Sequence, residues 1–308
     1  MSGSKGHSNG SVPTPRTPTP VRSARRYDRI VNLLGSADPH APQRVAAIIP
    51  AHNVGRDIAP TIRACRAIPG VDLLIVVDDG SDDNTGSYAR AAGAVVVRHS
   101  VERGRASAIE TGVKVAAMRD HADWPPRLLL ILSADLGESA VEASALVEAV
   151  MTGEADLACA VPASTDQHSG RSHAKNMARA RIRRSTGWEP TCPLALVRCA
   201  TREAIQASMP FMKGYGLEIA MTIDVLVAGL SVVEIPCHFE HSGADKSLGE
   251  LKPSLRFADA ALASARLTVR RVRLPGAHRL RQTIPQGIGI PFPRPARDRT
   301  AEEAQVQA

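Results

Sequence analysis

The chain has 308 residues, a formal net charge of +7 and five cysteines, and 44% of its residues are hydrophobic. This size and apolar content predict a globular protein, while the 3% share of aromatic residues predicts a core of Val, Leu, Ile and Ala and argues against a surface that stacks nucleic-acid bases. The odd number of scattered cysteines predicts reduced thiols, and the lack of an apolar run of about 18 residues predicts a cytoplasmic protein without a membrane span.

The two ends of the chain share one composition. Residues 1–42 are rich in Ser, Pro and Arg, and residues 276–308 are rich in Pro. Few large apolar side chains are present in either segment, so little burial is available to offset the entropy of ordering. We therefore expect two disordered tails, 1–42 and 276–308, around one folded domain over residues 43–275.

Short apolar runs alternate with helix-like segments in the first part of this domain. The runs cover residues 44–51, 72–79, 94–99 and 127–135. The helix-like segments between them cover residues 56–68, 82–93 and 103–120. This alternation predicts an α/β fold with a mostly parallel sheet flanked by helices, in which ligands bind beyond the carboxyl ends of the strands.

Carboxylates stand where two of these predicted strands end. Asp78 and Asp79 end the run over 72–79, and Asp135 ends the run over 127–135. Such positions suit ligand contacts. A second interpretation of Asp135 is an N-cap for a helix over 136–150, because aspartate accepts hydrogen bonds from free amides at a helix start. The residues alone leave both interpretations open.

Four motifs occur in a fixed order along the domain. They are "PAHN" (50–53), "VVDDGSDDNT" (76–85), "SADL" (133–136) and "GYGLEIAMTIDVLVAGLSVVEIPCHFEH" (214–241). Together they resemble the motifs of family 2 glycosyltransferases with the GT-A fold. The last block and "SGRSHAKN" (169–176) are most similar to bacterial glucosyl-3-phosphoglycerate synthases and more distantly similar to polyprenyl-phosphate sugar synthases. The resemblance implies a hexosyltransferase that moves glucose from a UDP-sugar to a phosphate-bearing acceptor such as 3-phosphoglycerate.

The resemblance also implies a set of residues that bind the donor. They are Pro50, Ala51, Asn53, Asp79, Ser81, Arg105, Ser133 and Lys246. In this set Asp79 would accept a hydrogen bond from the uracil N–H, and Arg105 would grip the diphosphate at the start of a helix. Lys246 would meet the leaving phosphate.

A metal site follows from the same resemblance. Asp135 and His241 would bind Mg²⁺ or Mn²⁺, which prefers oxygen ligands and takes few of them from the protein. We favour His241 over His238 as the imidazole ligand. Ser133 stands where the family's D-x-D motif has its first aspartate, which predicts a weaker metal affinity. This departure favours a second hypothesis, a catalytically degraded module that only binds nucleotide sugars.

The sugar and acceptor sites are implied in the same way. Tyr215 and Glu218 would line the sugar pocket and, with Asp135, form the catalytic set; Glu218 lies in the first turn of a helix, where the helix dipole favours its ionised form. Gly170, Arg171 and His173 correspond to the acceptor site, although His173 replaces a threonine of the relatives. A cationic segment either holds the acceptor phosphate or forms a solvated helix face. Its members are His173, Lys175, Arg179, Arg181, Arg183 and Arg184.

A third hypothesis concerns the basic segment over residues 262–282. Its partly amphipathic pattern is consistent with contact to an anionic membrane, where a polyprenyl phosphate would be the acceptor. No nucleic-acid partner is expected, and a homodimer is left open by the sequence.

Overall fold

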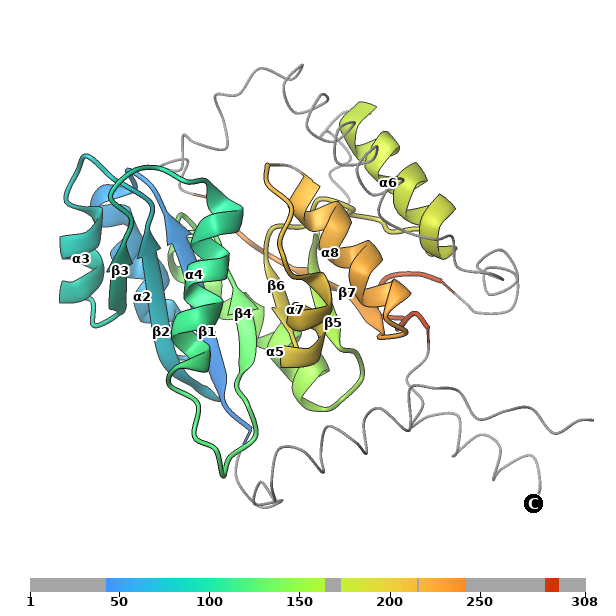
Figure 1. Ribbon diagram of the computed structural model, residues 1–308, viewed down its shortest axis with the longest axis horizontal. Helices are drawn as coiled ribbons and strands as arrows, with labels where there is room; N and C mark the ends of the chain where they lie inside the picture. Colours follow the sequence, from blue (N-terminus) through green and yellow to red (C-terminus); the bar gives the residue numbers. More distant parts are fainter. Residues whose placement is uncertain (1–42, 164–172, 215, 242–285, 294–308) are drawn as a thin grey trace, which may run out of the picture. The chain divides into compact units, whose positions relative to one another are not determined.

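The computed structural model describes residues 43–163, 173–214, 216–241 and 286–293, and the predicted tail over 1–42 lies outside these ranges. The strands are β1 (Val45–Ala51), β2 (Val71–Asp78), β3 (Val95–Arg98), β4 (Leu128–Ile131), β5 (Leu157–Pro162), β6 (Arg198–Ala200) and β7 (Val232–Cys237) (Figure 1). The helices are α2 (Ile58–Cys65), α3 (Thr85–Ala91), α4 (Arg105–Ala117), α5 (Ser144–Met151), α6 (His173–Thr186), α7 (Arg202–Ser208) and α8 (Gly216–Val227), with the 3-10 helices η1 (Gly55–Asp57) and η2 (Gly137–Ala143).

The described strands form one sheet of seven, in the order β3-β2-β1-β4-β6-β5-β7. All neighbours are parallel except β6, which runs antiparallel to both β4 and β5. The mostly parallel α/β sheet predicted from the alternation is therefore confirmed. β3 is an edge strand and its side chains are only partly buried, whereas its apolar run predicts burial on both faces.

Helices cover both faces of this sheet. Along β1, Ala46 and Ile48 belong to the core under α4, α6, α7 and α8, while Ala47 and Ile49 belong to the core under α2 and α5. Burial on both faces explains why β1 is a continuous apolar run. The predicted aliphatic core is confirmed, since Trp188 and Phe292 are the aromatic residues among the buried hydrophobic residues of the described chain.

Helix α8 is buried around its whole circumference. Every residue from Gly216 to Leu226 is buried, because the helix packs against α6, α7 and β7. Any charged side chain on α8, including Glu218, is thereby removed from bulk water.

The strand directions bring distant loops to one edge of the sheet. β1, β2 and β4 are mutually parallel, so the segments that follow Ala51, Asp78 and Ile131 all leave at the same edge. β6 is antiparallel to β4 and to β5, and β7 is parallel to β5, so β7 runs in the direction of β4. The segment after Cys237 therefore leaves at this edge too, and it carries His241.

Residues 286–293 fall inside the segment that the composition assigns to a disordered tail, and for these residues that prediction is wrong. Phe292 is 1% exposed, and its backbone exchanges two hydrogen bonds of 2.8 Å with Val232 of β7. Gln286 accepts a hydrogen bond from the Glu189 N–H. Burial of the large Phe292 side chain offsets the entropic cost of ordering a segment rich in proline and glycine. The remainder of 276–308 lies outside the described residues.

Replacing Phe292 with alanine tests this packing. We expect Phe292→Ala to lower the free energy of unfolding by about 3 kcal/mol, because it removes a fully buried aromatic ring and leaves a cavity. Urea denaturation followed by circular dichroism would measure the change. Ile288→Ala in the same segment is the control, since Ile288 is largely exposed and its truncation should change stability little. Equal midpoints for Phe292→Ala and the wild type would show that the segment does not pack on β7.

The described helices also bear on membrane contact. In the part of the chain that the structure describes, no helix is both long and apolar enough to cross a bilayer. The basic segment over 262–282, on which the membrane hypothesis depends, lies outside the described residues.

Candidate active site

The turns after β1 and β2 are joined by hydrogen bonds. Asn53 adopts a left-handed conformation (φ 51°), and its N–H donates to the Ser81 Oγ at 3.0 Å. Its Oδ1 accepts from the Asp82 N–H at 2.8 Å. Ala51, which follows Pro50 at the end of β1, accepts from the Asp79 N–H at 2.8 Å. The structure thus brings together the predicted donor-binding residues of these two turns, which are Pro50, Ala51, Asn53, Asp79 and Ser81.

Gly80 allows this turn to form against a neighbouring loop. Its φ is +74°, and a Cβ at this position would stand 2.6 Å from the Glu102 backbone nitrogen and 2.7 Å from the Val101 carbonyl carbon. Only glycine fits there, because both obstacles are backbone atoms that cannot move aside. The loop 101–104 therefore lies directly on the turn that holds Asp79.

The loop after β4 carries Ser133 and Asp135. Ser133 is 0% exposed, and within the described residues its hydroxyl has no hydrogen-bond partner. A buried hydroxyl without a partner is costly, so a ligand that bonds to Ser133 would relieve that cost. The alternative interpretation of Asp135 as a helix cap is not supported: η2 begins at Gly137, Leu136 takes the N-cap position, and no side chain caps it.

Asp135 instead faces His241, which lies 106 residues further along the chain. The His241 Nδ1 is 3.1 Å from both carboxylate oxygens of Asp135. Ser139 helps to hold His241 there, because its hydroxyl accepts from the Glu240 N–H at 2.9 Å and donates to the Leu136 carbonyl at 2.6 Å. The predicted metal pair is therefore adjacent in space.

This pair fits a divalent cation that also binds a diphosphate. A carboxylate and an imidazole nitrogen in contact can share one ion, and Mg²⁺ or Mn²⁺ commonly takes only one or two protein ligands and fills the remaining positions with phosphate oxygens and water. The described residues contain no group of three or more potential ligands, so no competing all-protein metal cage is present among them. His238 is exposed, and no contact between it and Asp135 is seen.

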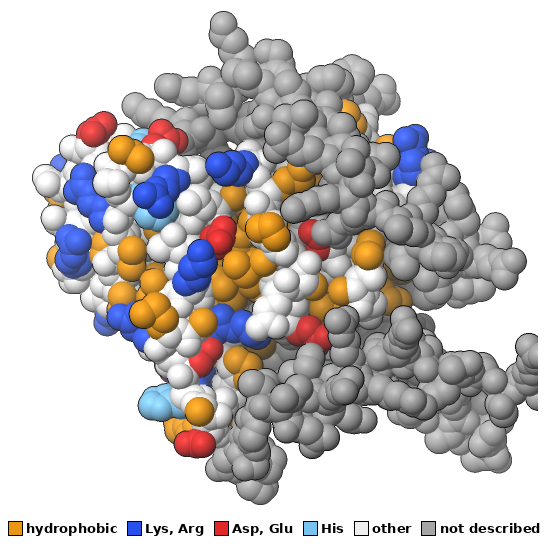
Figure 2. Space-filling view, in the orientation of Figure 1, with side chains coloured by type: hydrophobic (Ala, Val, Ile, Leu, Met, Phe, Trp, Pro, Cys, Tyr) orange, Lys and Arg blue, Asp and Glu red, His pale blue; other side chains and the backbone are white. Residues whose placement is uncertain are grey.

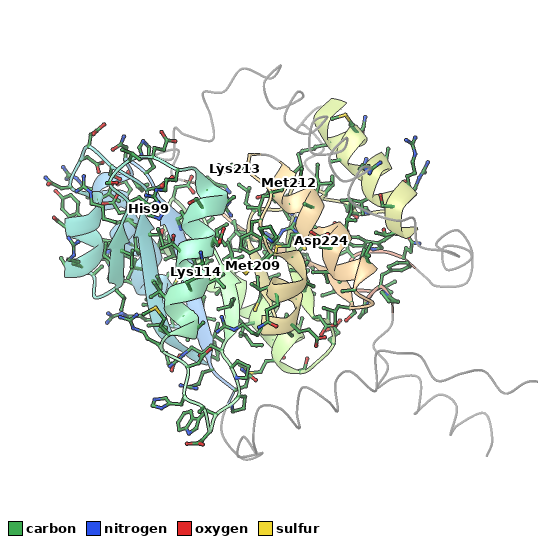
Figure 3. The ribbon with its side chains drawn as sticks, viewed as in Figure 1. His99, Lys114, Met209, Met212, Lys213 and Asp224 are labelled. Atoms are coloured by element: carbon green, nitrogen blue, oxygen red, sulfur yellow. The ribbon has the colours of Figure 1, made fainter. Side chains whose placement is uncertain are left out.

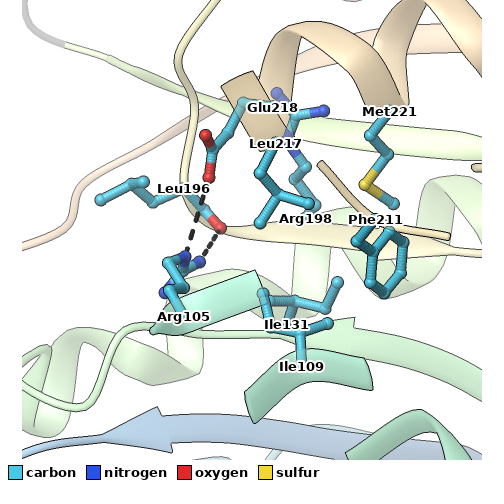
Figure 4. A pocket seen from close by; sticks show the side chains of 9 residues that line it. All are labelled: Arg105, Ile109, Ile131, Leu196, Arg198, Phe211, Leu217, Glu218 and Met221. Atoms are coloured by element: carbon cyan, nitrogen blue, oxygen red, sulfur yellow. Dashed lines mark hydrogen bonds and ion pairs between the residues drawn. The ribbon is translucent and has the colours of Figure 1, made fainter. Parts of the chain in front are cut away.

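Arg105 and Glu218 lie next to each other in the lining of a pocket (Figure 4). The other lining residues are Ile109, Ile131, Leu196, Arg198, Phe211, Leu217 and Met221. Arg105 is the first residue of α4, and its Nη2 donates to the Leu196 carbonyl at 2.8 Å. Its Nε is 3.7 Å from the Glu218 Oε1. The predicted diphosphate contact and the predicted sugar contact are thus an ion pair in this structure.

Glu218 is 4% exposed, and this burial raises the pKa of its carboxyl above the ordinary value. The positive charges of Arg105 and Arg198 oppose the effect by lowering the same pKa. Glu218 lies in the first turn of α8, as predicted, where the helix end favours its ionised form while burial disfavours it.

Other predicted residues are placed only in part. Gly170, Arg171, Tyr215 and Lys246 lie outside the described residues, and His173 begins α6 without a described side chain.

In the cationic segment, two arginines form hydrogen bonds or ion pairs with other residues of the chain. Arg179 donates to the carbonyls of Pro190 and Thr191 at 2.8 and 2.9 Å, and Arg183 pairs with Glu189 at 3.4 Å. On the described part of the face shown in Figure 2, Lys and Arg side chains are dispersed among other residue types.

Three residues of the site are absent from the sequence-based set. Arg198 donates to the Ala195 carbonyl and the Thr222 hydroxyl beside Glu218. Glu234, buried on β7, accepts from the Thr191 and Cys192 amides and anchors the loop that precedes the pocket. His99 contacts Asp79. Of the three, His99 had an available signal, because it lies two residues beyond the apolar run in "VVVRH", much as Asp135 lies shortly beyond the run that ends at Leu132.

Comparison with known sequences supports the order of motifs. The sequence model of the family described as Glycosyl transferase family 2 matches residues 46–214. An undecaprenyl-phosphate mannosyltransferase of Micrococcus luteus is 31% identical over 225 residues, which cover 68% of this chain and 88% of that protein. An uncharacterized protein of Methanocaldococcus jannaschii is 29% identical over 114 residues, so the chain matches 44% of that protein's length.

Comparison with solved structures supports the fold. The crystal structure of glucosyl-3-phosphoglycerate synthase from Mycobacterium tuberculosis, in complex with Mn²⁺, UDP and glucosyl-3-phosphoglycerate, matches with a TM-score of 0.57. The identity is 24%, and the match covers 76% of this chain and 83% of that chain. The GT-A fold predicted from the motifs is confirmed.

Proposed function

The chain belongs to glycosyl transferase family 2, and we propose that it transfers glucose from UDP-glucose to a small acceptor that bears a phosphate, such as 3-phosphoglycerate. The observation that carries this proposal is the contact between Asp135 and His241 at the sheet edge where the turns after β1 and β2 also lie. A nucleoside would occupy those turns and its diphosphate would reach the metal pair. The Mycobacterium tuberculosis synthase, crystallised with Mn²⁺, UDP and a glucosylated phosphoglycerate, supports the assignment of substrate class.

Each described residue has a definite task in this proposal. Asn53 and Ser81 hold the two nucleoside turns in register, and the unsatisfied hydroxyl of Ser133 bonds to the ribose. Asp135 and His241 hold the cation, which would act as a Lewis acid on the diphosphate. Arg105, at the positive end of α4, stabilises the negative charge that develops on the leaving diphosphate.

Glu218 binds the sugar rather than the diphosphate. Its carboxylate accepts hydrogen bonds from sugar hydroxyls once the donor draws Arg105 toward the phosphates. Apolar side chains such as Leu217 and Met221 wall this pocket and keep water out. Low water content strengthens each charge interaction inside it, which favours transfer over hydrolysis.

A second acceptor class is favoured by one specific finding. The Micrococcus luteus relative is an undecaprenyl-phosphate mannosyltransferase, and the match covers 88% of it. A polyprenyl phosphate also presents a phosphate to the sugar. We therefore include undecaprenyl phosphate as the alternative acceptor.

Product formation with purified full-length chain tests the proposal. UDP-glucose, Mn²⁺ and either 3-phosphoglycerate or detergent-solubilised undecaprenyl phosphate would be incubated with the protein, and glucosylated products would be followed by mass spectrometry. We expect product with 3-phosphoglycerate that disappears in chelator. Product with undecaprenyl phosphate but not with 3-phosphoglycerate would show that the acceptor is the polyprenyl phosphate. Binding of UDP-glucose without any product would favour the binding module instead.

A further inference from the structure

The carboxylate of Asp79 does more than border the nucleoside turn. Asp79 is 4% exposed, and its oxygens accept from the backbone amides of Arg103 at 3.0 Å and Gly104 at 2.7 Å. The imidazole of His99 lies 2.6 Å from the Asp79 Oδ1. These groups belong to the loop that leads into α4, so one side chain of the turn after β2 holds the start of that helix.

His99 extends this connection into the helix itself. His99, labelled in Figure 3, directly follows β3 and is 6% exposed. Its Nε2 lies 2.9 Å from the hydroxyl of Thr111 on α4. An ionised carboxylate can only accept, so the His99 Nδ1 carries the proton that bonds Asp79. In the neutral ring, Nε2 then accepts from the Thr111 hydroxyl.

The two contacts attach α4 at two separate points. Gly104 is the N-cap of α4 with φ +86°, and its amide is bound by Asp79. Thr111 lies nearly two turns further along the helix and is bound by His99. A rigid helix held at two points has a set position relative to the nucleoside turn. The residue placed by that position is Arg105, the first of α4 and the proposed diphosphate contact.

We propose that His99, acting through Asp79 and Thr111, is a positioning residue that keeps the N-terminus of α4 at the distance from the nucleoside turn that a nucleoside diphosphate spans. The inference rests on the proposed function, because it assigns a role in binding that donor. Asp79 keeps its two backbone amide partners without His99, so the nucleoside turn itself is retained. Loss of His99 therefore weakens the grip on the diphosphate and leaves the grip on the nucleoside nearly unchanged.

The ratio of two affinities tests this proposal. Binding of uridine and of UDP, at a fixed Mn²⁺ concentration, would be measured by NMR titration for the wild type and for His99→Leu. We expect His99→Leu to weaken UDP binding roughly tenfold, because α4 loses one of the two attachments that place Arg105, and uridine binding by less than about threefold. His99→Asn, which offers an N–H near the Nδ1 position, should recover most of the UDP affinity.

Further variants keep the test decisive if His99→Leu folds poorly. Thr111→Val removes only the outer hydrogen bond, and we expect a smaller shift of the same ratio in the same direction. His121→Leu is the control, because His121 is exposed and lies in the loop after α4, away from Asp79. Equal losses for uridine and UDP, or no loss for either, would overturn the inference. If the wild type bound neither ligand, the proposed function would fail first and the inference with it.

Discussion

Asp135→Asn is expected to lower kcat/KM for glucose transfer by about a thousandfold. A unit charge about 4 Å from the cation contributes about 4 kcal/mol at an effective dielectric constant near 20, and about 1.4 kcal/mol corresponds to a tenfold change in rate. Asparagine keeps the shape of the side chain and removes the charge. The affinity for Mn²⁺ should fall together with the rate, and electron paramagnetic resonance of free Mn²⁺ would measure it without substrate.

The control for this variant lies three residues away. Glu138 is exposed on the same rim, and Glu138→Gln removes an equal charge without touching His241. We expect Glu138→Gln to retain wild-type rate and Mn²⁺ affinity, and both variants to melt within a few degrees of the wild type. Full activity of Asp135→Asn in the presence of a chelator would exclude the metal pair as part of the mechanism.

Glu218→Gln is expected to reduce transfer about a hundredfold and to make the stability of the fold less sensitive to a rise in pH. The first effect follows from losing the charged acceptor for sugar hydroxyls in a dry pocket. The second follows from the raised pKa of Glu218, because keeping a buried carboxylate ionised costs free energy. If Glu218 serves function at the expense of stability, Glu218→Gln should both lower the rate of transfer and remove the cost of keeping this carboxylate ionised.

The direction of the pH effect follows from proton linkage. Burial raises the pKa of Glu218 in the folded state above its ordinary value, so the folded protein binds this proton more tightly than the unfolded chain. The stabilising contribution is complete below the unfolded pKa and is lost as the pH rises through the folded pKa. The variant has no such group. Its free energy of unfolding relative to the wild type should therefore increase as the pH rises from 4 to 8.

Urea denaturation of both proteins at several pH values would measure this difference. Other titrating groups are common to the two proteins and cancel in the comparison. Glu110→Gln is the control, since Glu110 pairs with Lys114 on the surface of α4. A difference between Glu218→Gln and the wild type that does not change with pH would show that Glu218 is ionised at no cost.

Much of the fold could be predicted from local pattern. The apolar run over 44–51 matches β1, and the run over 127–135 contains β4, because strands of a parallel sheet are buried on both faces and read as unbroken apolar segments. Asp135 stood out for the same reason, as a charge three residues after the last large apolar residue of such a run, Leu132. The short edge strand β3 and the all-round burial of α8 were harder to predict, because both depend on neighbours that are distant in sequence.

The candidate site divides along the same line. The composition, the alternation of strands and helices in the first part of the domain, and the motifs with their candidate ligands could be identified from the sequence alone. That Asp135 meets His241, that Arg105 pairs with Glu218 and that His99 binds Asp79 were decided only by the tertiary structure. These are contacts between side chains on different strands and helices, set by sheet order and helix packing, and no local pattern of residues encodes such distances. The same holds for Phe292. The prolines and glycines around it predict disorder, and only the tertiary structure shows that its backbone pairs with Val232 of β7.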